Sequence, residues 1–350
     1  MQKSGKRRLA KAIIMAFLAV GLQSAAHAED TEDRLAIHGY GHQGYLQTKE
    51  NNYLAADNKG TWDFNSLSIV ITAKVDDKTK IWMQLHSTSE KTRLDWSYVD
   101  YQLTNNLNGR AGQIKMPVGL YNEIRDIKFL QLSTLQPMLY QEASKMIQES
   151  FKGLSAIYNV DGLTLDAYAG QVTEWKENND PGHKAKRLTG GRVTYKTPVE
   201  GLRFMASAYN SAIDDTAATP VANGNRLVWI LSTDYANNNF DVKAEYAKMK
   251  FFNEESETYY LQAGYTYAEK WTPFVRYDSI VTNVAEITNP ANYQKATVLG
   301  LNYKINDSVS ARIENHWNNG YAMPRATKEV VDATAQKDWN MFAASVNFIF

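Results

Sequence analysis

The last thirteen residues of the chain, Asp338-Trp-Asn-Met-Phe-Ala-Ala-Ser-Val-Asn-Phe-Ile-Phe350, decide which fold it can adopt. Counted back from the end, every second side chain is apolar: Phe350, Phe348, Val346, Ala344 and Phe342. The side chains between them are mixed and include Asn347 and Ser345. Because successive side chains of a strand point to opposite faces, we predict a terminal strand with one apolar face. Such a long strand, with a face of this kind, is typical of a sheet whose outer surface contacts lipid.

Residues 1–28 have the features of a cleaved secretory signal. A basic start (Lys3, Lys6, Arg7, Arg8 and Lys11) precedes an apolar run at 12–22, and Ala26-His27-Ala28 supplies the small residues of a cleavage site. The apolar run is too short to span a bilayer, so an uncleaved anchor is the weaker alternative. Removing the signal leaves 33 basic residues (38 minus 5) against 38 acidic ones, a net charge of −5. This balance gives no indication of a nucleic-acid partner.

The rest of the chain repeats segments of alternating polarity that end in turn residues. We predict sixteen strands, at 35–49, 63–76, 79–90, 92–104, 108–115, 150–160, 163–174, 188–197, 201–211, 226–236, 239–251, 257–268, 271–281, 294–305, 308–318 and 338–350. Connections after even-numbered strands are short, and most of those after odd-numbered strands are long. This alternation predicts a 16-stranded antiparallel transmembrane β-barrel, all-β, with short periplasmic turns, formed by residues 29–350 as one domain. A soluble β-sandwich, the main alternative, gives no reason for such alternation.

The two faces of the predicted strands differ in charge. In 239–247, the apolar Phe240, Val242, Ala244 and Tyr246 alternate with Asp241, Lys243 and Glu245. A soluble barrel would need an apolar interior, so we predict the reverse: an apolar exterior and a polar, water-filled lumen. Aromatic residues near strand ends are expected to form two girdles at the membrane interfaces, in preference to scattered surface positions: Trp62, Tyr158, Tyr195, Trp229, Tyr246, Tyr267, Trp271, Tyr277, Tyr303, Trp317 and Trp339.

The longest predicted connection, residues 116–149 (the third loop), is rich in apolar residues such as Leu120, Ile124 and Leu139. We therefore expect it to fold into the barrel and narrow the pore, with a short helix within 121–132. Its predicted charged residues include Lys115, Glu123, Arg125, Asp126 and Lys128, and the facing wall residues are Arg192, Arg203, Arg276 and Arg312. Charges in a narrow passage with low-dielectric walls set ion preference, so these nine residues form the predicted electrostatic filter. The alternative is that Arg125, Asp126 and their neighbours only hold the loop in place.

The stretch Gly112-Gln-Ile-Lys115-Met-Pro117-Val-Gly119-Leu-Tyr-Asn122-Glu123-Ile-Arg125-Asp126 resembles the Gram-negative outer-membrane porins, including the phosphate-selective group. With the signal peptide, strand number, third loop and terminal Phe350, which would act as the C-terminal assembly signal, the resemblance covers the whole chain. It implies a homotrimer in the cell outer membrane, in contact with lipid, that passes small hydrophilic solutes and ions by passive diffusion. Anion or phosphate selectivity is the alternative; it is not carried over, because phosphate porins have strong clusters of Arg and Lys and the mature chain is net acidic.

Residues for enzyme or metal chemistry show no recognised spacing. The chain has six His and no Cys. His38 and His42 lie four residues apart, about 13 Å along a strand, which is too far for one metal ion. We therefore expect no cofactor, no metal and no enzyme activity. A Ser–His pair in the lumen, as in an outer-membrane phospholipase, and a barrel that encloses a partner protein are the alternatives.

Overall fold

The computed structural model describes residues 34–172, 183–215, 224–237, 239–251, 253–324 and 327–350. The predicted signal peptide lies outside the described residues. Among those residues, no helix is long and apolar enough to cross a membrane.

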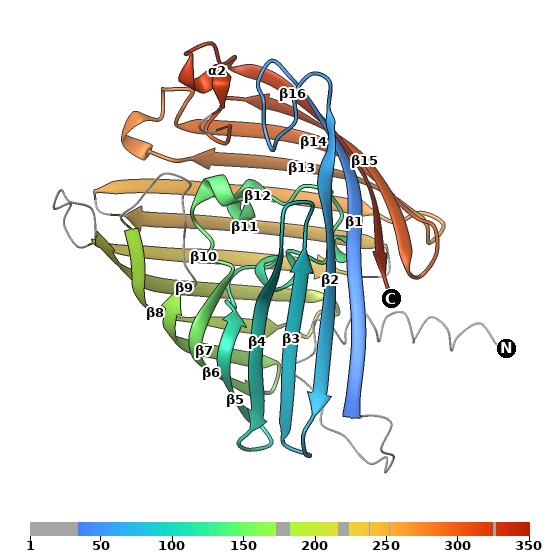
Figure 1. Cartoon of the computed structure of the whole chain (residues 1–350), viewed down its shortest axis with the longest axis vertical. Helices are drawn as coiled ribbons and strands as arrows, with labels where there is room; N and C mark the ends of the chain where they lie inside the picture. The colour runs from blue at the N-terminus through green and yellow to red at the C-terminus, as the bar shows by residue number, and fades with distance from the viewer. Residues whose placement is uncertain (1–33, 173–182, 216–223, 238, 252, 325–326) are drawn as a thin grey trace.

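Sixteen antiparallel strands form one closed barrel, in which each strand pairs with its neighbours in sequence and β1 pairs with β16 (Figure 1). The strands are β1 (Leu35–Lys49), β2 (Thr61–Lys74), β3 (Thr79–Ser87), β4 (Thr92–Gln102), β5 (Leu107–Lys115), β6 (Ser150–Val160), β7 (Leu163–Val172), β8 (His183–Lys196), β9 (Leu202–Asp215), β10 (Gly224–Ala236), β11 (Phe240–Phe251), β12 (Glu254–Tyr265), β13 (Trp271–Val281), β14 (Tyr293–Lys304), β15 (Val309–Asn319) and β16 (Asp338–Ile349). The predicted fold and every predicted strand are confirmed.

The connections alternate in length as predicted. The turn between β6 and β7 has only two residues, Asp161 and Gly162, with φ angles of 41° and 80°. Such left-handed pairs match the twist of a tight hairpin, which is why an Asp-Gly sequence occurs there. The longest connection, between β5 and β6, carries the short helices η2 (Asn122–Ile124), η3 (Lys128–Leu130), η4 (Met138–Tyr140) and η5 (Glu142–Ser144). The short turns therefore gather at one end of the barrel.

The terminal strand has the predicted phase. Ser345 and Asn347 are buried inside, whereas Phe342, Val346 and Phe350 are 38%, 46% and 64% exposed on the outer face. The backbone groups of Phe350 and Gly39 exchange two hydrogen bonds of 2.9 Å, which helps to close the ring. A Cβ atom on Gly39 would overlap the Phe350 ring, so the glycine permits this contact.

One detailed prediction is wrong. Trp339 shares its phase with Asn347, so it points inward, packs against Tyr53 and donates from its indole N–H to the Gly320 carbonyl at 2.9 Å. It therefore does not belong to an outer girdle. The short helix predicted within 121–132 is present as two separate 3-10 helices, η2 and η3. The Gln131 amide there donates to the carbonyls of Ile124 and Arg125, which a continuous helix would use internally.

Candidate functional site

The third loop is fixed inside the barrel by wall carboxylates. Glu245 of β11 is 3% exposed and accepts hydrogen bonds from the backbone N–H of Leu120 at 2.9 Å, Tyr140 Oη at 2.6 Å, Tyr260 Oη at 2.7 Å and Ser232 Oγ at 2.6 Å. Four donors of this kind satisfy a buried carboxylate that has no basic partner among the described residues. Glu245 therefore joins both arms of the loop to the wall.

A second and a third carboxylate repeat this arrangement farther along the same side of the wall, on β15 and β13. Glu314 of β15 accepts from the backbone N–H groups of Thr134 at 2.8 Å and Leu135 at 3.1 Å. Asp278 of β13 accepts from the backbone N–H of Met138 at 3.3 Å. The wall thus supplies hydrogen-bond acceptors for backbone N–H groups of the third loop that are buried and would otherwise have none.

Two of the predicted filter residues, Arg276 and Arg312, bind the loop from the same side. Each is 1% exposed. Arg276 donates to the Leu135 carbonyl at 2.9 Å and pairs with Asp278 at 2.6 Å, and Arg312 donates to the carbonyls of Ser133 and Phe129 at 3.3 Å and 3.2 Å. Both guanidinium groups are therefore placed at the anchor of the loop and away from open space.

Lys115 and Asp126 form the root of the loop. The Lys115 ammonium contacts Asp126, lies 3.2 Å from Glu149 and 3.9 Å from Asp95. The three carboxylates converge within 4.8 Å, a spacing suited to a cation, and the ammonium group supplies that charge. Burial alone would raise the pKa of Asp126, but the charges of Lys115, His86 and Arg125 together with the hydrogen bond from Lys115 outweigh it and hold this pKa below its usual range.

The remaining predicted filter residues of the loop, Arg125 and Lys128, are partly exposed. Arg125 donates to the Tyr140 carbonyl at 3.1 Å and to Asn122 Oδ1 at 3.5 Å, so its partners belong to the loop itself. The Lys128 ammonium lies 5.9 Å from the centre of the Phe64 ring. Burial, together with the charges of Arg125 and Arg312, lowers the pKa of Lys128 to about 7.

One ion pair connects the loop to the wall across a pocket. Arg192 of β8 bonds Asp166 of β7 at 3.0 Å and Glu123 of the loop at 2.5 Å. The Glu123 side chain is 41% exposed, and Arg192 holds its pKa below the usual range although burial acts in the opposite direction. One oxygen of the Glu123 carboxylate is therefore paired with Arg192, while the side chain remains accessible from the pocket.

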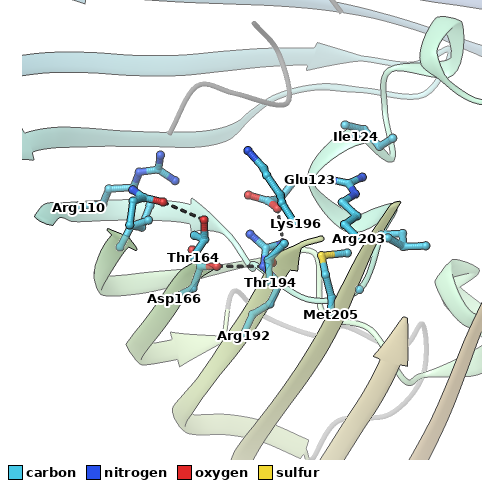
Figure 2. A pocket seen from close by; sticks show the side chains of 14 residues that line it. Arg110, Glu123, Ile124, Thr164, Asp166, Arg192, Thr194, Lys196, Arg203 and Met205 are labelled. Atoms are coloured by element: carbon cyan, nitrogen blue, oxygen red, sulfur yellow. Dashed lines mark hydrogen bonds and ion pairs between the residues drawn. The ribbon is translucent and has the colours of Figure 1, made fainter. Parts of the chain in front are cut away.

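The pocket lies between the third loop and the β5–β9 wall (Figure 2). It encloses about 120 Å³ and is lined by four basic residues, Arg110, Arg192, Lys196 and Arg203, and by the acidic Glu123 and Asp166. Aspartates hold two of the arginines at the wall: Arg110 pairs with Asp100 at 2.8 Å, and Arg203, whose side chain is 25% exposed, pairs with Asp234 at 2.7 Å. Of the predicted filter residues, the structure brings Glu123, Arg192 and Arg203 together here.

The sequence interpretation did not include Arg110 and Lys196. Arg110 could have been found from the alternation of β5. Its neighbour Ala111 is exposed on the outer face, so Arg110 must point inward, where it stands opposite Asp100 of β4. Lys196 is the last residue of β8, where alternation alone does not decide the direction of a side chain. Only the closed barrel brings Lys196 to the pocket.

Comparisons with known proteins identify the architecture. No family model matches the chain, and no curated protein matches it. Three solved structures align over nine-tenths of its length: the anion-selective porin from Comamonas acidovorans (TM-score 0.64, 11% identity, 90% of this chain and 99% of that one), OmpF of Salmonella typhi in complex with daunomycin (0.64, 12%, 90% and 97%), and OmpT of Vibrio cholerae in its trimer form (0.58, 11%, 90% and 99%).

The fold is that of the Gram-negative outer-membrane porins. Within this porin fold, the lumen wall also holds two Ser–His contacts: Ser66 Oγ to His42 Nδ1 at 3.0 Å and Ser68 Oγ to His86 Nδ1 at 2.8 Å. Ser68 is fully buried and Ser66 is 9% exposed. These hydroxyls are closed to a substrate, so the pairs serve the packing of the wall.

Proposed function

We propose that the chain is an outer-membrane channel for the passive diffusion of small hydrophilic solutes and ions. The observation that carries this proposal is a closed barrel with a charged inner wall, in which the third loop packs against β11, β13 and β15 but leaves a charged pocket along β5–β9. An apolar outer face and a porin fold support a place in the outer membrane, reached through the signal peptide, with the short turns in the periplasm. Porins are channels, and enzyme activity is not part of the proposal.

We infer that weak charge selectivity arises in this pocket, chiefly from Glu123 of the loop and from Arg192 and Arg203 of the wall. Four basic and two acidic residues line it, and Asp100 and Asp234, which pair with Arg110 and Arg203 but do not line the pocket, reduce this excess of positive charge. Because a narrow passage with low-dielectric walls focuses such charge, a mild preference for anions is expected. The similar fold of an anion-selective porin agrees with this sign. Lys115, Arg125, Asp126, Arg276 and Arg312 act mainly by holding the loop that shapes the passage, and Lys128 adds a charge that depends on pH.

A homotrimer is the proposed assembly. It rests on the resemblance of the sequence to porins and on the trimer form of a protein with a similar fold. Native mass spectrometry of the folded chain in detergent tests it, and a stable monomer would contradict it.

Conductance in planar bilayers tests the channel itself. Stepwise current increases are expected, with a reversal potential in a KCl gradient that shows a slight preference for chloride. Correctly inserted protein that produces no steps would contradict a channel and favour a scaffold or an enclosing conduit. Glu123→Gln is expected to strengthen the preference for chloride, because it removes an acidic group from the pocket.

A further inference from the structure

Two aromatic side chains of neighbouring strands face the lumen beside the pocket. Trp82 of β3 stands opposite Tyr98 of β4 in register. Their chain neighbours Ile81 and Val99 are 41% and 40% exposed on the outer face, so the two rings point inward. Both residues lie in the half of their strands that is nearer the short turns. The inner wall therefore carries apolar rings among its charged residues at this level.

A third ring extends this surface toward the third loop. Trp96 lies two residues from Tyr98 on β4, and its indole N–H donates to Gln84 Oε1 at 2.9 Å. The centre of the Tyr98 ring lies 6.5 Å from that of Trp82 and 5.7 Å from that of Trp96, with interplanar angles of 19° and 29°. We call these three rings the aromatic strip. Rings that follow one another in nearly parallel planes offer a surface against which another flat ring can pack.

The aromatic strip is open to the lumen, whereas other inward rings are closed off. Tyr209 and Tyr260 are 1% and 2% exposed, and their hydroxyls donate to the Met146 carbonyl and to Glu245. Trp96 and Tyr98 also pack against the interior apolar cluster, which fixes their position, but all three rings of the strip remain partly exposed. The strip therefore keeps free surface that the packing of the third loop does not use.

Arg110 connects the aromatic strip to the pocket. Its guanidinium carbon lies 5.1 Å from the centre of the Tyr98 ring, and the same residue lines the pocket together with Lys196 (Figure 2). Arg110 pairs with Asp100 through Nε at 2.8 Å, and a guanidinium group has five N–H donors, more than this one contact uses. A flat ring that carries a negative charge can thus contact the strip and the basic side of the pocket at the same time.

We propose that the aromatic strip and the pocket together bind aromatic carboxylates, with the ring against Tyr98 and Trp82 and the carboxylate at Arg110. The inference rests on the proposed channel function and names a substrate class for it. A small inorganic anion gains only from the basic residues, and a neutral ring gains only from the strip. An aromatic carboxylate gains from both, since guanidinium groups bind carboxylates and aromatic rings pack on aromatic rings.

Fluorine NMR of the full folded chain in a zwitterionic detergent tests the site, with 4-fluorobenzoate as the probe. The native chain is expected to bind it at least tenfold more tightly than trifluoroacetate, which has the charge without the ring. The same difference is expected for 4-fluorobenzyl alcohol, which has the ring without the charge. The comparison of the three probes on the native chain decides the test even if a variant does not fold.

Ring-removing variants locate the binding site. Trp82→Leu and Tyr98→Leu are each expected to weaken binding of 4-fluorobenzoate about fivefold, because each removes a ring but keeps an apolar side chain. Tyr98→Phe keeps the ring and is expected to retain the affinity. Trp317→Leu is the matched control, since Trp317 of β15 is 47% exposed on the outer face.

Equal binding of 4-fluorobenzoate and either of the other probes would overturn the proposal. Equal affinities of the native chain, Trp82→Leu and Tyr98→Leu would also overturn it, as would an equal loss in Trp317→Leu. The assay measures binding, whereas current steps in KCl measure the channel. Current steps from a chain without this preference would contradict the inference alone, and binding without current steps would contradict the channel alone.

Discussion

Glu123 stands apart from the other carboxylates that meet the third loop. Its side chain is 41% exposed, whereas Glu245 and Glu314 are almost completely buried and bind backbone N–H groups. A carboxylate that is both ion-paired and open to the pocket competes with passing anions for Arg192. The charge of a single residue therefore acts on the passage at this point.

Exchange of single charges in the pocket is expected to move ion selectivity in opposite directions. Glu123→Gln raises the ratio of chloride to potassium permeability about twofold, and Arg203→Gln lowers it by a similar factor, because each removes one charge from the focused field. Reversal potentials in a KCl gradient measure both. Lys295→Gln, a change at an exposed lysine on the outer face of β14, serves as the control. Identical ratios in all variants would contradict a filter in this pocket.

Selectivity is also expected to depend on pH through Lys128. The pKa of this lysine is lowered to about 7, so the ammonium form dominates below that pH and the neutral amine above it. The preference for chloride is therefore expected to grow as pH falls from 8 to 6. Partial exposure of Lys128 to lumen water limits the size of the change. Lys128→Met is expected to remove it, and an unchanged pH profile in that variant would assign the effect elsewhere.

At the scale of elements, the third loop behaves as part of the wall. Carboxylates of β11, β13 and β15 accept its N–H groups, and arginines of β13 and β15 donate to its carbonyls. Backbone groups that would need water in a free loop are thus satisfied by the barrel. The loop can carry many apolar residues because it is not exposed as loops usually are.

Removal of the Glu245 carboxylate is expected to release the loop. Glu245→Ala leaves Leu120, Tyr140, Tyr260 and Ser232 without their shared acceptor, which lowers the free energy of unfolding by about 3 kcal/mol. Urea titration in vesicles measures this, and increased current noise should accompany it. Glu257→Ala, which breaks a solvent-accessible pair with Lys248, is expected to have little effect on the free energy of unfolding. Equal losses in the two variants would contradict the anchoring role.

The inward fold of this loop could be predicted, but its contacts could not. The apolar residues of 116–149 indicated burial correctly. The roles of Arg276 and Arg312 depend on where the loop crosses the lumen, and no local pattern contains that path. The helix within 121–132 is divided into η2 and η3 for a related reason: the Gln131 amide takes the carbonyls of Ile124 and Arg125, which a continuous helix would use for its own hydrogen bonds.

At the scale of the whole molecule, one alternation rule places every strand. Period-two patterning is local, so sixteen strands and their facing could be read from the sequence, and Phe350 set the phase of the last one correctly. The girdle prediction is wrong for Trp339 because an aromatic ring at a strand end can lie on either face of the barrel. The contact with the Tyr53 ring places it on the inner face. The pocket joins β5 to β9 with the third loop, which no single strand reveals.

Loss of the terminal ring is expected to affect assembly more than the finished fold. Phe350 is 64% exposed, and its ring covers Gly39 at the closing pair of strands. Phe350→Ala is expected to reduce the yield of folded barrel, seen as a heat-sensitive band on a gel, several-fold at 37 °C. The urea midpoint of the barrels that do form should shift little, because the lost side chain faces outward. Phe342→Ala, on the same face of β16, is the control, and an equal drop in yield would contradict a special role for the terminus.

The loop's contact with β16 links the shape of the pore to the closure of the barrel. Thr134 Oγ1 lies 3.0 Å from Ser345 Oγ, on the strand that joins β1 and completes the ring. The strand that closes the barrel is thus also one that contacts the third loop. A change at Ser345 acts on the closing strand and on the position of the loop together, so the seam of the barrel and the width of the passage are coupled through this one contact.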